Sequence, residues 1–122
     1  MTLATITLIL AGLGAFWTAV LAFVFLRDPA KGLAMTDHHH SELPQVMTDR
    51  YFALVILALA AVLYRDFYVI AFLFAVFSFL GFADAYIYRK AGKPFHKHLS
   101  AGFSGALVAL LAVLALKSGV TA

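Results

Sequence analysis

The side chains best suited to chemistry are an acid and an imidazole at the facing ends of two apolar segments. Asp84 lies about one helical turn before the end of a segment that closes at Tyr88, and His98 lies near the start of the next segment. A carboxylate and an imidazole held together can exchange a proton with a third molecule. An ionisable residue inside an apolar segment is costly to place, so it indicates a function or a specific partner. We therefore predict Asp84 and His98 as catalytic residues, with Asp49 as a further carboxylate in that role.

Other side chains complete the predicted site. Arg50 follows Asp49 directly, and Tyr88 lies one helical turn after Asp84. A guanidinium or a phenol at these positions would donate to an oxygen that gains negative charge. Arg50, Tyr88 and Trp17, the single tryptophan, are the candidate substrate-binding residues. For Trp17 the competing interpretation is packing, with its indole N–H bonded to a local acceptor.

The chemistry open to this site is limited by what the sequence lacks. The chain contains no cysteine, no phosphate-binding glycine loop and no cofactor motif, which leaves reactions that need only proton transfer. We predict a cofactor-independent isomerase or hydrolase for a small lipophilic molecule, acting by double-bond isomerisation or epoxide opening, or failing that a binding module. Two alternatives stay open: a small proton-coupled transporter or channel, and a non-catalytic assembly subunit whose polar side chains only join helices.

A second polar cluster, in the loop after the first apolar segment, contains the consecutive imidazoles of His38, His39 and His40. On an extended chain His38 and His40 point to one side and His39 to the other, so His39 does not easily join a metal ion held by its neighbours. The His-x-x-x-His spacing of helical zinc sites is absent. We interpret the cluster as a solvated loop and predict no metal ligands, with metal or haem binding as the open alternative.

Apolar segments long enough to cross a membrane must position these residues. The chain has 122 residues, of which 64% are hydrophobic and only 12% charged, whereas a soluble domain is roughly half apolar. Four stretches reach the ~20 residues that span a bilayer: approximately 2–26, 44–64, 67–88 and 94–116. We predict an all-α membrane protein, a single domain formed by an antiparallel bundle of four transmembrane helices. These spans leave no room for a nucleic-acid-binding domain, so the expected partners are the lipid bilayer and a lipophilic ligand.

The charges of the loops set the expected orientation. Six lysines and arginines follow the first and third segments, against Arg65 and Lys117 on the other side. By the positive-inside rule, both termini of this multi-pass protein of the cell membrane then face away from the cytoplasm. The candidate residues of the second, third and fourth segments converge at the cytoplasmic mouth in this arrangement.

Small residues indicate where the helices pack, because they let neighbouring backbones approach closely. The third segment has a mostly small face, with Gly81 and Asp84 on its shoulder: Ala71, Ala75, Ser78, Phe82 and Ala85. The fourth segment has a glycine and alanine face: His98, Gly102, Gly105, Ala109 and Ala112. We expect the first, second and fourth helices to meet along such faces, the phenylalanine-rich face of the third to contact lipid or another subunit, and the bundle to form a homo-oligomer.

The chain resembles a family of small, uncharacterised four-span integral membrane proteins of bacteria and fungi. The resemblance rests on three short motifs and extends over most of the chain: Asp28-Pro29-Ala30, Arg50-Tyr51-Phe52-Ala53-Leu54 and Ala83-Asp84-Ala85. It implies the four-span fold and no activity. Small multidrug exporters and dual-topology fluoride channels fit less well, because the first segment has no acid and the chain has no asparagine.

Overall fold

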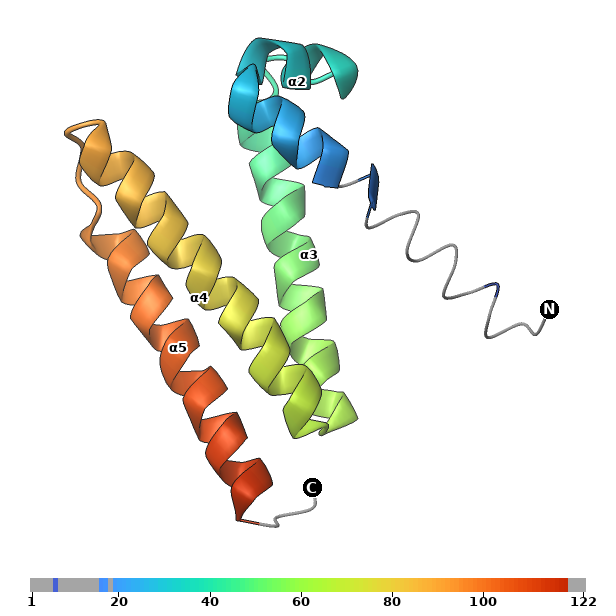
Figure 1. Cartoon of the computed structure of the whole chain (residues 1–122), viewed down its shortest axis with the longest axis vertical. Helices are drawn as coiled ribbons and strands as arrows, with labels where there is room; N and C mark the ends of the chain where they lie inside the picture. Colours follow the sequence, from blue (N-terminus) through green and yellow to red (C-terminus); the bar gives the residue numbers. More distant parts are fainter. Residues whose placement is uncertain (1–5, 7–15, 18, 119–122) are drawn as a thin grey trace. The chain divides into compact units, whose positions relative to one another are not determined.

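The computed structural model describes residues 6, 16–17 and 19–118, and these residues form α-helices joined by short turns (Figure 1). The chain divides into two units, Met1–Asp49 and Arg50–Ala122, each described here by itself. Most of the expected first span, 2–26, lies outside the described residues. The remaining expected spans correspond to α3 (Leu43–Tyr64), α4 (Phe67–Lys90) and α5 (His96–Lys117), whose ends lie within two residues of those predicted.

The first unit contains a short helix where the sequence predicts a loop. Residues 19–27 are helical, and α2 (Pro29–Met35) follows directly. Asp28 caps α2, since its Oδ1 accepts a hydrogen bond from the Lys31 N–H at 3.0 Å, and Pro29 takes a first-turn position where its missing N–H costs nothing. Gly32 is buried against Phe25, so α2 packs on the preceding helical residues.

The second unit contains α4, α5 and the part of α3 from Arg50 onward, and these helices are long and apolar enough to cross a membrane. The helices α3, α4 and α5 have 22, 24 and 22 residues, and each qualifies as a candidate membrane span by length and composition. Asp66 sets the start of α4, because its carboxylate accepts hydrogen bonds from the N–H groups of Tyr68 and Val69. Three candidate spans within the described residues indicate a multi-pass helical membrane protein.

The helices α4 and α5 run antiparallel and pack along each other (Figure 1). The buried residues of this contact are all small: Ser78, Gly81 and Ala85 from α4, and Gly102, Gly105 and Ala112 from α5. A Cβ atom built on Gly81 would lie 2.7 Å from the Cα of Gly102, which shows how closely the two backbones approach. We call this contact the small-residue seam.

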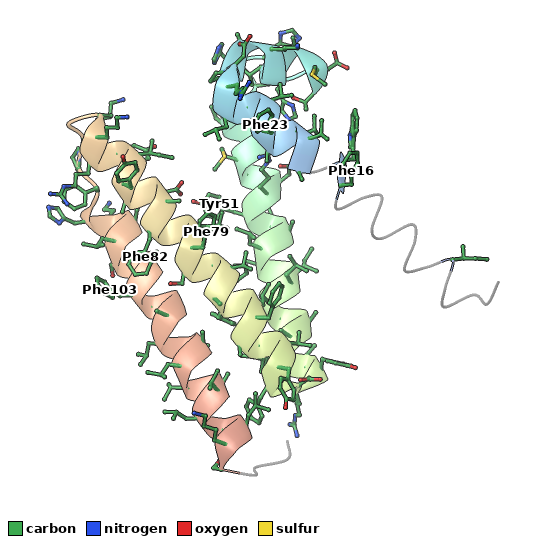
Figure 2. The ribbon with its side chains drawn as sticks, in the orientation of Figure 1. Phe16, Phe23, Tyr51, Phe79, Phe82 and Phe103 are labelled. Atoms are coloured by element: carbon green, nitrogen blue, oxygen red, sulfur yellow. The ribbon has the colours of Figure 1, made fainter. Side chains whose placement is uncertain are left out.

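The seam also contains one interhelical hydrogen bond, in which the Ser78 hydroxyl donates to the Gly102 carbonyl at 2.8 Å. Beside it, the rings of Phe82 and Phe103 meet edge to face with centroids 5.1 Å apart, and both are labelled in Figure 2. Ser78 and Ala85 lie on the face that the sequence predicts, but Ala75 is exposed and Gly81 is central rather than on the shoulder. The third and fourth predicted spans are therefore direct packing partners, as the short turn between them predicts.

Candidate functional site

The structure brings the predicted acid and imidazole together at the turn end of α4 and α5. The Nδ1 atom of His98 lies 3.6 Å from Oδ2 of Asp84, the one ion-pair distance found among the described residues. The separation is longer than a hydrogen bond, so the two side chains lie close together without a hydrogen bond between them. The expectation that these helices place Asp84 beside His98 is confirmed, while their catalytic role stays a prediction.

Tyr88 joins this pair through its ring. It lies on α4 one turn beyond Asp84, and its ring stacks on the imidazole of His98 with centroids 4.6 Å apart and an interplanar angle of 13°. Stacked aromatic pairs contribute roughly 0.5–1.5 kcal/mol beyond the area they bury. The stack therefore fixes the plane of the imidazole while the carboxylate contacts its edge.

Two features of the hairpin bring these side chains together. The first is the seam: Asp84 lies three residues after Gly81, and His98 lies four residues before Gly102, so the closest backbone contact is one turn away from the pair. The second is the turn between the helices, in which Gly92 has a φ of +67°, a conformation that favours glycine.

The turn closes α4 with a Schellman motif. The Lys93 N–H donates to the Tyr88 carbonyl at 2.9 Å, and the Gly92 N–H donates to the Arg89 carbonyl at 3.1 Å. These bonds satisfy carbonyl groups that the helix end would otherwise leave unpaired. The start of α5 is thereby held close to the last turns of α4, which carry Asp84 and Tyr88.

The pair faces outward from the hairpin rather than into it. The side chain of Asp84 is 47% exposed and that of His98 is 31% exposed. The space between the two helices is filled by the backbone of the seam and offers no room for a ligand there. A molecule that reaches the carboxylate would approach from the side of the hairpin, through the region that lipid or a further helix occupies.

The remaining candidate residues, Arg50, Asp49 and Trp17, are exposed within their own units. Arg50 belongs to the same unit as Asp84 but makes no ion pair with any residue that the structure describes. Asp49 and Trp17 belong to the first unit, where both are exposed. Three of the six predicted site residues, Asp84, Tyr88 and His98, therefore form one contact group.

The histidine loop lines an open depression of about 440 Å³ within the first unit. Its lining includes Ala30, Leu33 and Asp37 together with the three histidines. The Nδ1 atom of His38 lies 2.8 Å from the hydroxyl of Thr36 and forms a hydrogen bond with it. In the described part of the chain, no three His, Asp or Glu side chains gather closely enough to hold a metal ion.

The sequence places Ser78 on the small-residue face and Gly81 on its shoulder, but it does not predict that Gly81 and the Ser78 hydroxyl set how closely α4 and α5 approach. The available signal was the pairing of small residues at compatible spacing, Ser78 and Gly81 on one segment with Gly102 and Gly105 on the next, at equal distances from a short turn.

No protein-family model, curated protein or solved structure matches this chain. The resemblance to small four-span membrane proteins accordingly stays a prediction.

Proposed function

We propose that this chain is a four-span protein of the cell membrane that binds a small lipophilic molecule and moves a proton on it. Three candidate spans support the membrane location, and the apolar residues 2–26 supply the proposed fourth. The excess of lysine and arginine after the first and third spans supports an orientation with both termini outside the cytoplasm.

The observation that carries the proposal is the outward-facing pair of Asp84 and His98. Their side-chain atoms lie 3.6 Å apart, and the stacked ring of Tyr88 brings a phenol to the same place. A molecule dissolved in the bilayer reaches this group laterally. Its apolar body stays in lipid, while its polar group lies at the carboxylate, the imidazole and the phenol.

The reaction that fits these groups is isomerisation of a β,γ-unsaturated ketone to its conjugated α,β-unsaturated isomer. The Asp84 carboxylate removes a proton from the carbon between the carbonyl and the double bond, and the electron pair moves onto the carbonyl oxygen. The Tyr88 hydroxyl donates a hydrogen bond to that oxygen. The proton then returns to the far carbon of the former double bond, so that no atom or electron is gained or lost. The His98 imidazole, with its Nδ1 3.6 Å from the carboxylate, flanks the base in this scheme.

An isomerisation assay tests this proposal directly. The purified protein in mild detergent is given a β,γ-unsaturated ketone with an alkyl tail, and the conjugated product is followed by its ultraviolet absorbance. We expect the wild type to exceed the rate in empty micelles, and Asp84→Asn to lose on the order of 10²-fold or more of that excess.

The matched control is Asp66→Asn, at the opposite end of the same helix. It makes the same chemical change, and asparagine retains the ability to cap α4 as Asp66 does. We expect this variant to keep the wild-type rate. A wild type no faster than empty micelles, or a control as slow as Asp84→Asn, would refute the proposed chemistry.

A second function, that of an assembly subunit, is favoured by the large apolar faces of the second unit. Phe72, Phe79 and Tyr86, spaced by seven residues along α4, are each more than 60% exposed. Such a stripe suits a partner helix as well as lipid. Native mass measurement in several mild detergents tests for a homo-oligomer, and a monomer in all of them contradicts it.

A further inference from the structure

The turn between α4 and α5 concentrates positive charge, and its own residues include no acid. Residues 89–97, which we call the basic turn, contain four cationic side chains, all exposed: Arg89, Lys90, Lys93 and Lys97. No aspartate or glutamate follows Asp84 in the sequence, and Asp84 lies beside His98. None of these cations forms an ion pair with a residue that the structure describes.

The basic turn is an ordered element. The two bonds of the Schellman motif fix its first half, and the guanidinium of Arg89 lies over the ring of Phe95 at 6.0 Å. The Phe95 ring in turn stacks on His96, with centroids 4.5 Å apart. The cations therefore project from a fixed backbone, and little chain entropy is lost when they engage an anion.

The length of α4 places these cations at the headgroup level of a bilayer. A helix of 24 residues is about 36 Å long, which exceeds the ~30 Å hydrocarbon core of a membrane. Tyr86 and Tyr88 are both exposed and precede the first cation, Arg89. Exposed tyrosines are typical of the interface between hydrocarbon and headgroups. Arg89 and Lys90 lie just beyond them, where lipid phosphates are found.

The opposite end of the same helices is different. It carries Arg65 and Lys117, and the carboxylate of Asp66 lies beside Arg65 in the sequence. That carboxylate caps α4. The two ends of α4 and α5 therefore differ strongly in net positive charge, although both must lie near a membrane surface.

We propose that the basic turn is a binding site for the headgroup of an anionic phospholipid. Arginine matches the geometry of a phosphate with paired N–H donors, and the lysines add mobile point charges around it. The acyl chains of such a lipid lie along the apolar sides of α4 and α5. Each Lys or Arg of a polybasic segment adds roughly 1 kcal/mol to the free energy of binding to an anionic membrane surface. This corresponds to about a fivefold preference for anionic lipid per charge.

Native mass spectrometry from nanodiscs tests the proposal. The discs contain equal amounts of phosphatidylglycerol and phosphatidylcholine, and the ratio of the two lipids retained on the released protein is measured. We expect the wild type to retain phosphatidylglycerol preferentially. The double variant Lys93→Gln/Lys97→Gln should lose on the order of 30-fold of this preference, because two charges are removed.

The matched control removes the same number of charges at the other end, in Arg65→Gln/Lys117→Gln. This variant should keep the wild-type lipid preference far better than the turn variant, because the Asp66 carboxylate next to Arg65 offsets its charge and Lys117 belongs to no cluster of cations. Millimolar inorganic phosphate should leave the ratio unchanged, because it lacks the acyl chains that add affinity for the helices. Any one of three results would overturn the proposal. These are an equal loss of lipid preference in the two double variants, displacement of phosphatidylglycerol by inorganic phosphate, and equal retention of both lipids by the wild type. Far-ultraviolet circular dichroism checks that each variant keeps its helices.

Discussion

The glycines of the small-residue seam should respond very differently to the same substitution. A Cβ atom added at Gly81 meets backbone on the facing helix, namely the N and Cα of Gly102 and, at 3.0 Å, the carbonyl oxygen of His98. The three heavy atoms nearest to a Cβ atom added at Gly102 all belong to the side chain of Phe82, at 2.7 to 2.9 Å. Backbone cannot move without separating the helices, whereas a partly exposed ring can rotate.

The cost of Gly81→Ala follows from these distances. Carbon atoms in contact normally lie ~3.5–4.0 Å apart, so a Cβ placed 2.7 Å from the Cα of Gly102 requires the helices to separate by about 1 Å. Overpacking of this kind costs roughly 1–3 kcal/mol. Alanine has a higher helix propensity than glycine, which offsets up to ~1 kcal/mol of this cost. We expect Gly81→Ala to lower the free energy of unfolding by about 1–2 kcal/mol.

Gly102→Ala serves as the matched comparison. The Phe82 ring is 36% exposed and can move to another rotamer, at a cost of about 0.5–1.5 kcal/mol that the propensity gain nearly offsets. Because the chain has no cysteine, a fluorophore pair on Phe72→Cys and Leu110→Cys can report helix separation during unfolding in mixed micelles of dodecyl sulfate. Equal stability losses in the two variants, or an unchanged Gly81→Ala, would show that the seam is not limited by backbone contact.

Two further predictions concern the site and its turn. In a double-mutant cycle, Asp84→Asn and His98→Gln should each destabilise the second unit. The double variant should lose about 0.5–1 kcal/mol less unfolding free energy than the sum of the two single losses, since a partly exposed polar contact between membrane helices is modest. Strict additivity in the same unfolding assay would exclude the interaction. Gly92→Ala should lower the free energy of unfolding by about 1–2 kcal/mol through its positive φ alone, because no atom lies near the added Cβ. Gly92→Asn should lower it less, since asparagine tolerates this conformation. Equal losses in the two variants would show that the positive φ is not the cause.

The helices of the second unit could be predicted from sequence because their limits are set locally. The length of each apolar run fixes a span, and Asp66 supplies a cap at the start of α4. At the other end of α4, Gly92 supplies the left-handed residue that closes the helix. None of these features depends on which helices are neighbours. The meeting of Asp84 and His98 could be predicted as well, since a turn this short forces the two helices that it joins to pack antiparallel.

The packing face of α4 could not be predicted, because it depends on which neighbour the helix meets. The pattern of small residues admits both a face through Ala75 and Ser78 and a face through Ser78 and Gly81. The two faces differ by only a modest rotation of α4 about its axis, so the position of α5 decides which face is packed. Tertiary contact also explains α2, since Gly32 lies against the Phe25 ring and stabilises a helix too short to persist alone.

The seam and the candidate site are mechanically linked, and this affects how variants of either are interpreted. Gly81 lies one turn from Asp84, and its missing side chain lets α4 approach the carbonyl of His98. A helix separation of about 1 Å would lengthen the 3.6 Å contact between Asp84 and His98 past the range of an ion pair. Gly81→Ala would then impair binding or proton transfer without touching either titratable group. Gly102→Ala leaves the helix spacing intact, so a loss of activity confined to Gly81→Ala would show that the site depends on how closely α4 and α5 pack.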